Sequence, residues 1–195
     1  MCKRVILVTG TPCVGKTSVA RLLTAKLDAL YINLTDLALR HHLTSGKDEN
    51  RDTIIVDESK MRKRIRELIQ KTDKEEVVID GHYAVSVVPR KLVTFVFVLR
   101  RDPVELREFM KRCGFSEPKM TENLASEILD VCLMDALNAV GGERTCELDV
   151  TGKSIEEIVG AMLDVMADSS KCCVGVVDWL GKLENEGLLD EFLRI

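Results

Sequence analysis

Apolar and polar positions follow two different periods along the chain, and together they predict strands separated by helices. Continuous apolar runs of strand length predict strands at residues 4–9, 30–33, 76–80, 93–99 and 146–150. Apolar residues spaced three and four positions apart predict helices at residues 16–27, 34–42, 57–71, 103–111, 121–140 and 155–166. Strands that alternate with helices in this order indicate a doubly wound α/β sheet.

Turn and capping residues set the expected boundaries of these elements. Residues 43–53 are polar and contain a glycine, so they predict a loop, and residues 113–120 predict a short polar interruption. Residues 121–140 contain neither glycine nor proline and predict the longest helix of the chain. Ser154, with Glu157 three residues later, predicts a capping box for the helix that follows.

The last segment, residues 174–195, has apolar residues at near-helical spacing, and two glycines divide it into two short pieces. Helices this short do not hold alone in water, so each piece must bury its apolar side. Trp179 and Phe192 are the large side chains that we expect to anchor it. The surface that receives them is either the rest of this chain, which is the commoner case, or another molecule.

Composition and charge narrow the class of protein. Hydrophobic residues make up 46% of the 195 residues and charged residues 31%, a balance typical of a soluble globular domain. The formal net charge of −4 argues against a broad basic face that binds nucleic acid. No apolar stretch reaches the length needed to span a bilayer, so we expect no membrane contact.

The seven cysteines are an odd number, and none of their spacings fits a zinc site. Several lie within apolar runs, as buried free thiols do, which indicates a reducing compartment. The N-terminus enters a strand almost at once and lacks the features of a signal peptide. We therefore expect a cytoplasmic protein, with the nucleus as an alternative if the source is eukaryotic.

Residues 10–17 read G-T-P-C-V-G-K-T and match the phosphate-loop pattern G-x-x-x-x-G-K-[ST] at every fixed position. The loop follows a predicted strand and opens a predicted helix, so its backbone N–H groups and the helix N-terminus can face one polyphosphate. Lys16 is expected to reach the β- and γ-phosphates, and the Thr17 hydroxyl to ligate Mg²⁺. Agreement of pattern and context disfavours the alternative, a glycine-rich turn that binds nothing. The predicted ATP-binding residues are Gly10, Cys13, Val14, Gly15, Lys16, Thr17, Ser18 and Lys153.

Cys13 occupies a position where many such loops have glycine. A side chain there predicts a slightly altered loop, because positive φ values are costly for residues other than glycine. A thiol among the N–H groups of a helix N-terminus is also predicted to have a lowered pKa and to react as thiolate. Bound phosphates would then shield it from alkylation.

Asp80 and His82 follow the strand at 76–80 and form the second half of the predicted site. A carboxylate at the carboxyl end of a parallel strand faces the ligand crevice, so Asp80 is expected to hold Mg²⁺ together with Thr17. The alternative is a capping or turn aspartate. His82 is predicted to orient a water or a phosphate or to act in acid–base chemistry, and a surface loop histidine is its alternative.

Phosphoryl transfer places charge on the equatorial oxygens, and guanidinium groups suit that charge. Four arginines lie where they could reach it: Arg40, Arg100, Arg101 and Arg112. For each of them a solvated surface charge is an equally weighted alternative.

Several segments together resemble one known family, adenylate kinase isoenzyme six. They are Gly10 to Thr17, Tyr31-Ile32-Asn33, Asp36-Leu37-Ala38, Val96 to Arg100, Cys113 to Glu117 and Thr121-Glu122-Asn123. Asp80 and His82 also match its Asp-x-His signature. The resemblance covers roughly residues 5–167. It implies a three-layer P-loop NTPase fold of the nucleoside-monophosphate kinase type, with a parallel five-stranded sheet. It further implies a kinase domain over 1–167, a monophosphate arm near 33–56, a short lid near 111–121 and a helical appendage over 168–195.

The same resemblance implies an enzyme that converts ATP and AMP into two ADP with Mg²⁺ and has ATPase activity beside it. It also implies a role in small ribosomal subunit maturation through a ribosomal protein. The catalytic residues it implies are Lys16, Asp80, His82 and Arg112. The residues it implies for AMP binding are Asn33, Asp36 and Arg40.

This chain departs from the family pattern at three places. Cys13 replaces a glycine, Cys113 to Phe115 stand where the family has Arg-Gly-Tyr with Arg112 one place earlier, and Arg40 is displaced by one residue. The second functional hypothesis is therefore an ATP-driven assembly factor, in which hydrolysis resets a protein–protein contact and kinase turnover is incidental. A short lid favours it, because a poorly sealed site admits water as the acceptor. A third hypothesis, an adaptor that binds no nucleotide, is disfavoured by the loop.

Overall fold

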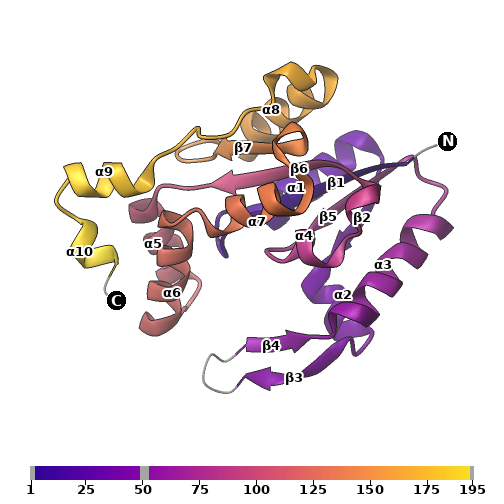
Figure 1. The fold of residues 1–195 in the computed structure, drawn as a ribbon, viewed down its shortest axis with the longest axis horizontal. Coiled ribbons are helices and arrows are strands. Elements are labelled where there is room, and N and C mark those ends of the chain that lie inside the picture. Colours follow the sequence, from indigo (N-terminus) through magenta and orange to yellow (C-terminus); the bar gives the residue numbers. More distant parts are fainter. Residues whose placement is uncertain (1–2, 49–52, 194–195) are drawn as a thin grey trace.

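A computed structural model describes residues 3–48 and 53–193 of the chain, and its centre is a parallel five-stranded sheet. The strand order is β2-β5-β1-β6-β7, and each neighbouring pair runs parallel (Figure 1). The strands of this sheet are β1 (Arg4–Thr9), β2 (Leu30–Asn33), β5 (Glu76–Asp80), β6 (Val93–Arg100) and β7 (Thr145–Asp149). The predicted α/β fold with five parallel strands is confirmed.

Helices cover both faces of this sheet, which explains why its central strands are apolar without alternation. They are α1 (Lys16–Leu27), α2 (Leu34–Arg40), α3 (Glu58–Lys71), α4 (Ala84–Val87), α5 (Pro103–Arg112), α6 (Glu117–Ile128), α7 (Val131–Val140), α8 (Ile155–Ala167), α9 (Trp179–Asn185) and α10 (Leu189–Phe192). The chain also contains three short 3₁₀ turns among the described residues, η1 (Arg90–Leu92), η2 (Gly142–Arg144) and η3 (Ser169–Lys171). Among the described residues, no helix is both long and apolar enough to cross a membrane.

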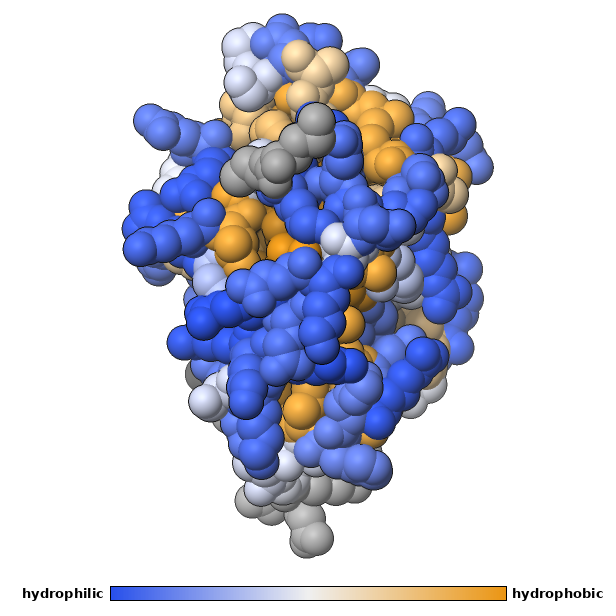
Figure 2. Space-filling view, turned by 90° about the vertical axis from the view of Figure 1, so that its right-hand side faces the viewer, coloured by the Kyte–Doolittle hydropathy of each residue, from blue (hydrophilic) through white to orange (hydrophobic). Residues whose placement is uncertain are grey.

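Successive residues of β1 contribute to two separate parts of the core. Ile6 and Val8 pack with α1, α5, α6, α8 and the C-terminal segment, whereas Val5 and Leu7 pack with α3, α4 and α7. This division follows from the period of two along a strand. The face seen in Figure 2, on the α3 side of the molecule, is mostly hydrophilic, with apolar residues visible between the charged side chains.

The sequence-based boundaries are right where the signal is local. Ser154 and Glu157 form the predicted capping box at the start of α8. Asp102 caps α5 by accepting a hydrogen bond from the Val104 N–H at 2.8 Å.

The segment 43–53 is not the loop that its polarity predicts. Residues Thr44–Asp48 form strand β3, which pairs antiparallel with β4 (Thr53–Val56) and makes a hairpin that projects from the domain (Figure 1). The ladder to the apolar β4 supplies the backbone hydrogen bonds, so pairing overrides the weak strand propensity of a polar, glycine-containing sequence. Residues 49–52 of the expected loop lie outside the described residues.

The single helix predicted over 121–140 is two helices. The first, α6, already begins at Glu117, so it also shortens the predicted polar interruption, and it ends at Ile128. The second, α7, begins at Val131 after Asp130 takes a left-handed conformation with φ of 57°. The Asp130 carboxylate accepts a hydrogen bond from the Arg100 guanidinium at 2.5 Å. Arg100 and Asp130 are 30 residues apart in the sequence, and their ion pair stabilises the left-handed residue that ends one helix before the next begins. No glycine or proline marks this boundary in the sequence.

The C-terminal segment packs on this same chain, the first of the two alternatives. Trp179, Leu183 and Phe192 are buried, with at most 7% of each residue exposed, and α9 and α10 lie beside α6 (Figure 1). A disulfide joins Cys146 of β7 to Cys172, just before this segment. The expectation that these two cysteines are free thiols is therefore wrong, because folding brings their Cα atoms to 4.9 Å from each other.

Candidate active site

The loop between β1 and α1 has the geometry of a phosphate cradle. Gly10 has φ of 136°, and a Cβ atom there would lie 2.4 Å from the Leu99 carbonyl oxygen, so only glycine fits. Gly15 has φ of 106° and immediately precedes the first helical residue, Lys16. The chain thus turns sharply into the N-terminus of α1, where free backbone N–H groups suit an anion.

Cys13 adopts a left-handed backbone conformation, with φ of 69°, which is unfavourable for a residue that carries a side chain. The backbone therefore keeps a positive φ of the kind that glycine favours, and Cys13 accepts the strain. The predicted alteration of the loop stays a prediction. The expected thiolate is wrong, however, because burial and the neighbouring Cys113 thiol raise the pKa of Cys13 to about 11, against a smaller opposing effect of Lys16. Cys13 therefore carries a neutral thiol at physiological pH, close to the predicted lid.

Lys16 lies back across the loop that precedes it. Its Nζ donates a hydrogen bond to the Thr11 carbonyl oxygen at 2.8 Å. Removal from water lowers the pKa of Lys16, and the carboxylates of Asp80 and Glu127 act in the opposite direction. An ammonium group held in this way is stabilised by any anion that enters the loop. Val14 of the same loop is fully buried, whereas Ser18 is exposed.

Asp80 joins three elements at the carboxyl edge of the sheet. Its carboxylate accepts one hydrogen bond from the Thr17 hydroxyl at 2.7 Å and another from the Asn33 side-chain amide at 2.7 Å. Asn33 ends β2 directly opposite Asp80 in the parallel register. Only 1% of Asp80 is exposed, so its negative charge is desolvated and directed at these donors. The structure thus brings Thr17, Asp80 and Asn33 together.

A hydroxyl and a carboxylate side by side fit the donor set that Mg²⁺ takes beside a nucleotide. In the described part of the chain, no group of three or more His, Cys, Asp and Glu side chains could hold a metal by itself. Mg²⁺ bound through one or two protein oxygens plus phosphates and water needs no such group. Thr17 and Asp80 therefore fit the ion.

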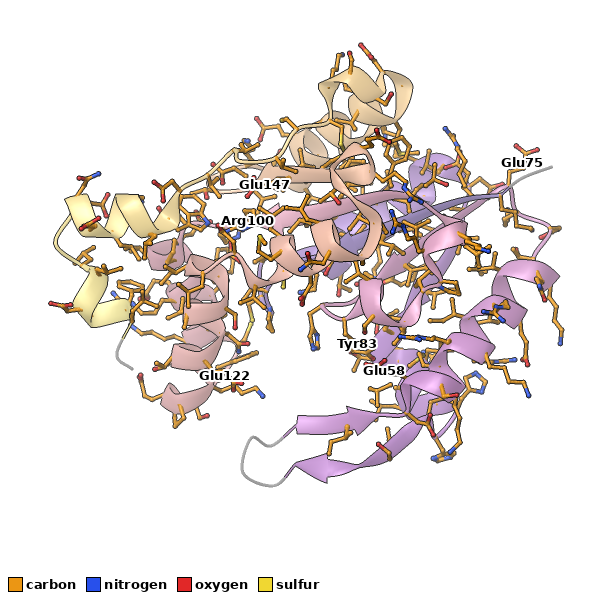
Figure 3. The ribbon with its side chains drawn as sticks, viewed as in Figure 1. Glu58, Glu75, Tyr83, Arg100, Glu122 and Glu147 are labelled. Atoms are coloured by element: carbon orange, nitrogen blue, oxygen red, sulfur yellow. A yellow bond between two sulfur atoms is a disulfide. The ribbon has the colours of Figure 1, made fainter. Side chains whose placement is uncertain are left out.

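A cavity of about 640 Å³ adjoins the loop and extends between α4, α6 and α7. Thr11, His82, Tyr83 and Asn123 are among the residues that line it. Figure 3 shows Tyr83 and Glu122, which also lines it, on opposite sides. The Asn123 side-chain N–H₂ and the Tyr83 hydroxyl are buried and have no hydrogen-bond partner among the described residues. Groups of this kind stay without a partner until a polar ligand or an ordered water reaches them.

His82 lies at the rim of this cavity, with its ring edge-on to Tyr83 at 4.9 Å between centroids. His82 as a residue is exposed, as its surface-loop alternative expects. Partial desolvation of its ring, and then repulsion from the cations of Lys16 and Lys119, lower the pKa of His82 to about 4. The imidazole is consequently neutral at physiological pH, and it can donate one hydrogen bond and accept another.

None of the three residues expected to bind AMP lines this cavity. Asn33 contacts Asp80 and also caps α2, where its side chain accepts a hydrogen bond from the Asp36 N–H at 2.8 Å. Asp36 and Arg40 form an exposed ion pair at 3.9 Å. Asn33, Asp36 and Arg40 line a separate hollow of about 360 Å³ next to β2, which Arg21 and Tyr31 also line.

The four candidate arginines have different surroundings. Arg100 is 1% exposed and pairs with three carboxylates, which leaves it no face toward the cavity. As a candidate for the transferred phosphate Arg100 is wrong, because these partners already neutralise it (Figure 3 labels Arg100 beside Glu147). The alternative of a solvated surface charge is wrong as well, because Arg100 is buried. Arg101 donates to the Val14 carbonyl oxygen in the loop. Arg112 is exposed and, like Arg101, lies over the Phe109 ring at 4.7 Å.

Lys153 follows β7 and is exposed, and its Nζ donates to the Asp149 carbonyl oxygen at 2.7 Å. Its assignment to ATP stays a prediction.

Sequence reasoning missed Glu127, although it holds the loop through a hydrogen bond from the Thr11 hydroxyl. Its signal was present, since Glu127 lies on the same helical face as Leu124 and Ile128, both buried. A carboxylate on the apolar face of a predicted helix indicates a buried polar partner. Tyr83, Lys119 and Asn123 were also missed, and nothing in their local spacing distinguishes them.

Sequence comparisons place this site in a known family. Residues 6–130 match the family model described as an AAA domain. The chain is 39% identical over 176 residues to the protein named "Putative adenylate kinase" of Pyrococcus furiosus, which covers 90% of this chain and 91% of the relative. Proteins of the same name in Thermococcus kodakarensis and Methanocaldococcus jannaschii are 39% and 32% identical. They cover 90% and 91% of this chain and 92% and 93% of their own lengths.

Solved structures show the same fold at low sequence identity. A shikimate kinase from Acinetobacter baumannii in complex with shikimate has a TM-score of 0.62 at 13% identity and covers 86% of this chain and 94% of its own. A gluconokinase from Sinorhizobium meliloti has a TM-score of 0.56 at 19% identity, with coverage of 87% and 95%. The family-model match and the sequence relatives together show that the chain belongs to the adenylate kinase-like family of AAA-domain P-loop proteins.

Proposed function

We propose that this protein transfers the γ-phosphoryl group of ATP to AMP, giving two ADP, and that it hydrolyses ATP beside this reaction. The observation that carries the proposal is the cavity of about 640 Å³ that opens on the phosphate loop and contains unpartnered polar groups. A phosphate cradle alone would serve a switch or a transporter as well. A second polar cavity next to it supplies a place for a phosphoryl acceptor.

The loop side holds ATP in this proposal. Backbone N–H groups from Gly10 to Ser18 bind the phosphates, and Lys16 moves its ammonium group from the Thr11 carbonyl oxygen to the β- and γ-phosphates. The Thr17 hydroxyl and the Asp80 carboxylate hold Mg²⁺. The ion, when bound, neutralises charge on the phosphate oxygens. Lys153 and Arg112 are proposed to contact the ATP side from β7 and from the lid.

The acceptor enters the cavity on the other side of the loop. The Asn123 amide and the Tyr83 hydroxyl donate hydrogen bonds to the acceptor, and the Lys119 cation attracts the phosphate of the acceptor. Neutral His82 at the rim orients the attacking oxygen or a water. Asn33, Asp36 and Arg40 contact the monophosphate when the arm closes; the Arg40 side chain is 78% exposed and can turn.

A second candidate follows from the surface beside this cavity. Leu129, Val131 and Met134 are 51%, 41% and 49% exposed at the junction of α6 and α7. An exposed apolar group of this kind is typical of a protein contact. It favours the isoenzyme six interpretation, in which ATP hydrolysis resets contact with a ribosomal protein of the small subunit during its maturation.

Initial rates of ADP formation from ATP and Mg²⁺, with and without AMP, test the first candidate. We expect AMP to raise the rate, with two ADP formed per ATP consumed, and phosphate release to supply the slower background. AMP-independent ADP formation, matched by equal phosphate release, would contradict kinase turnover and support the ATPase. Titration with small-subunit ribosomal proteins, with and without ATP, then tests the assembly role.

A further inference from the structure

The carboxylate of Glu127 is the meeting point of the phosphate loop, the end of β6 and the C-terminal segment. It is buried in α6, with 1% of the residue exposed. One oxygen accepts a hydrogen bond from the Thr11 hydroxyl at 2.5 Å. The other accepts from Arg100 Nε at 2.9 Å, from the Arg101 backbone N–H at 3.1 Å and from the Trp179 indole N–H at 3.2 Å.

These contacts hold the phosphate loop at two points. Thr11 is held directly, and its carbonyl oxygen is the acceptor of the Lys16 ammonium group. Val14 is held indirectly, because its carbonyl oxygen accepts from the Arg101 guanidinium, and the backbone N–H of Arg101 donates to Glu127. A rotation of the Glu127 carboxylate would therefore change both the Thr11 and the Val14 sides of the loop.

The C-terminal segment contributes to the same network. Trp179 lies 52 residues beyond Glu127 in the sequence, and only 7% of it is exposed. The segment is held nearby by the disulfide to β7 and by the Val176 N–H, which donates to Glu147 at 2.7 Å. Glu147 in turn pairs with Arg100. The same buried group of charges thus receives donors from both the loop and the segment.

We propose that Glu127 is a positioning residue for the phosphate loop and that Trp179 completes its hydrogen bonding from the C-terminal segment. A buried carboxylate needs all its donors, and the loss of one shifts the others. Trp179 thereby becomes coupled to Lys16 through Glu127 and Thr11. This inference rests on the proposed binding of ATP and ADP at the loop, and it adds a role for a segment that lies outside that loop.

The fluorescence of Trp179 tests this coupling, because it is the only tryptophan of the chain. We expect Mg–ADP to change its emission in the wild-type protein. In Thr11→Val, which keeps the shape and loses the hydroxyl donor, ADP should still bind by calorimetry while the emission change is lost. If calorimetry shows binding to the wild type with no change in emission, or if Thr11→Val keeps the full change, the coupling is overturned. If calorimetry shows no ADP binding at all, the proposed function fails first and this inference with it.

Two variants of the C-terminal segment separate positioning from packing. Trp179→Phe removes the indole N–H, and Phe192→Leu trims an aromatic ring of the same segment that is 2% exposed and lies under the Arg107 guanidinium. We expect Trp179→Phe to raise the KM for ATP about threefold to tenfold, the size of the net contribution of one typical hydrogen bond. Phe192→Leu should lower Tm and leave that KM unchanged. Equal changes of KM in both variants, or none in Trp179→Phe, would overturn the positioning role.

Discussion

The ammonium group of Lys16 is held by the loop to which it belongs, through the Thr11 carbonyl oxygen at 2.8 Å. It has no apolar packing role, so Lys16→Ala should fold normally. Loss of a central cation from the transition state is expected to slow ADP formation by about 10²–10³-fold, by analogy with other electrostatic donors. Lys26→Ala, an exposed lysine of the same helix, is the matched control. A folded Lys16→Ala protein with near wild-type rates would rule out the assignment.

The negatively charged carboxylate of Asp80 accepts hydrogen bonds from Thr17 and Asn33. Asp80→Asn keeps the shape and removes that charge, so the Mg²⁺ concentration for half-maximal activity should rise about tenfold or more. The exposed residue Asp73 supplies the control variant Asp73→Asn. Activity is measured as a function of Mg²⁺ at fixed ATP, and Tm is measured in parallel. Superimposable Mg²⁺ curves would remove Asp80 from the metal's surroundings.

The raised pKa of Cys13 predicts how fast its thiol reacts with an alkylating reagent. Its pKa is raised to about 11, first by burial, so the reactive thiolate is scarce at neutral pH and increases as the pH rises toward that value. We expect alkylation of Cys13 to be slower at neutral pH than that of Cys173, an exposed free thiol, and to accelerate with pH. Bound ATP should slow it further. Mass spectrometry of the labelled peptides measures both rates, and preferential labelling of Cys13 at neutral pH would contradict the raised pKa.

At the scale of elements, local signals predict well and distant contacts do not show in the sequence. The β1–loop–α1 unit is predictable because its glycines, its apolar strand and its helix lie within a few residues of one another. The hairpin of β3 and β4 and the break between α6 and α7 depend on pairing with other segments. The apolar face of α6 signals that Glu127 is buried, but its partner Thr11 is 116 residues away and does not show in the local sequence. Of the candidate site, the loop, Asp80 and His82 were therefore predictable, whereas the rest of the cavity lining was not.

The break between α6 and α7 combines a left-handed Asp130 with its ion pair to Arg100. Asp130→Ala loses the ion pair and keeps a Cβ atom at φ of 57°, whereas Asp130→Gly loses the ion pair and relieves the backbone. We expect both to unfold at lower temperature than the wild type, with the alanine variant less stable than the glycine variant by about 1 kcal/mol. Thermal denaturation measures the order, and an alanine variant as stable as the wild type would show that the break needs neither feature.

At the scale of the whole molecule, the C-terminal segment completes the core on the α5 and α6 side of the sheet. It also brings one donor to the carboxylate that holds the phosphate loop. Stability and activity are thus expected to depend on the same residues. This distinguishes the segment from an extension that only carries a partner-binding surface.

Deletion of residues 174–195 tests this dependence and leaves the disulfide between Cys146 and Cys172 in place. The deletion exposes apolar core and removes the buried side chains of Trp179, Leu183 and Phe192, each worth about 1.5–3 kcal/mol when buried. At about 2–4 °C of Tm per kcal/mol for a chain of this size, Tm should fall by about 10 °C or more. ADP formation should fall with it even at temperatures where the truncated protein is folded, because Glu127 loses a donor. Leu180→Ser, at a 42% exposed position of the same segment, is the control that should change neither quantity. A truncated protein with unchanged Tm and activity, but with altered self-association or partner binding, would instead identify the segment as an interface.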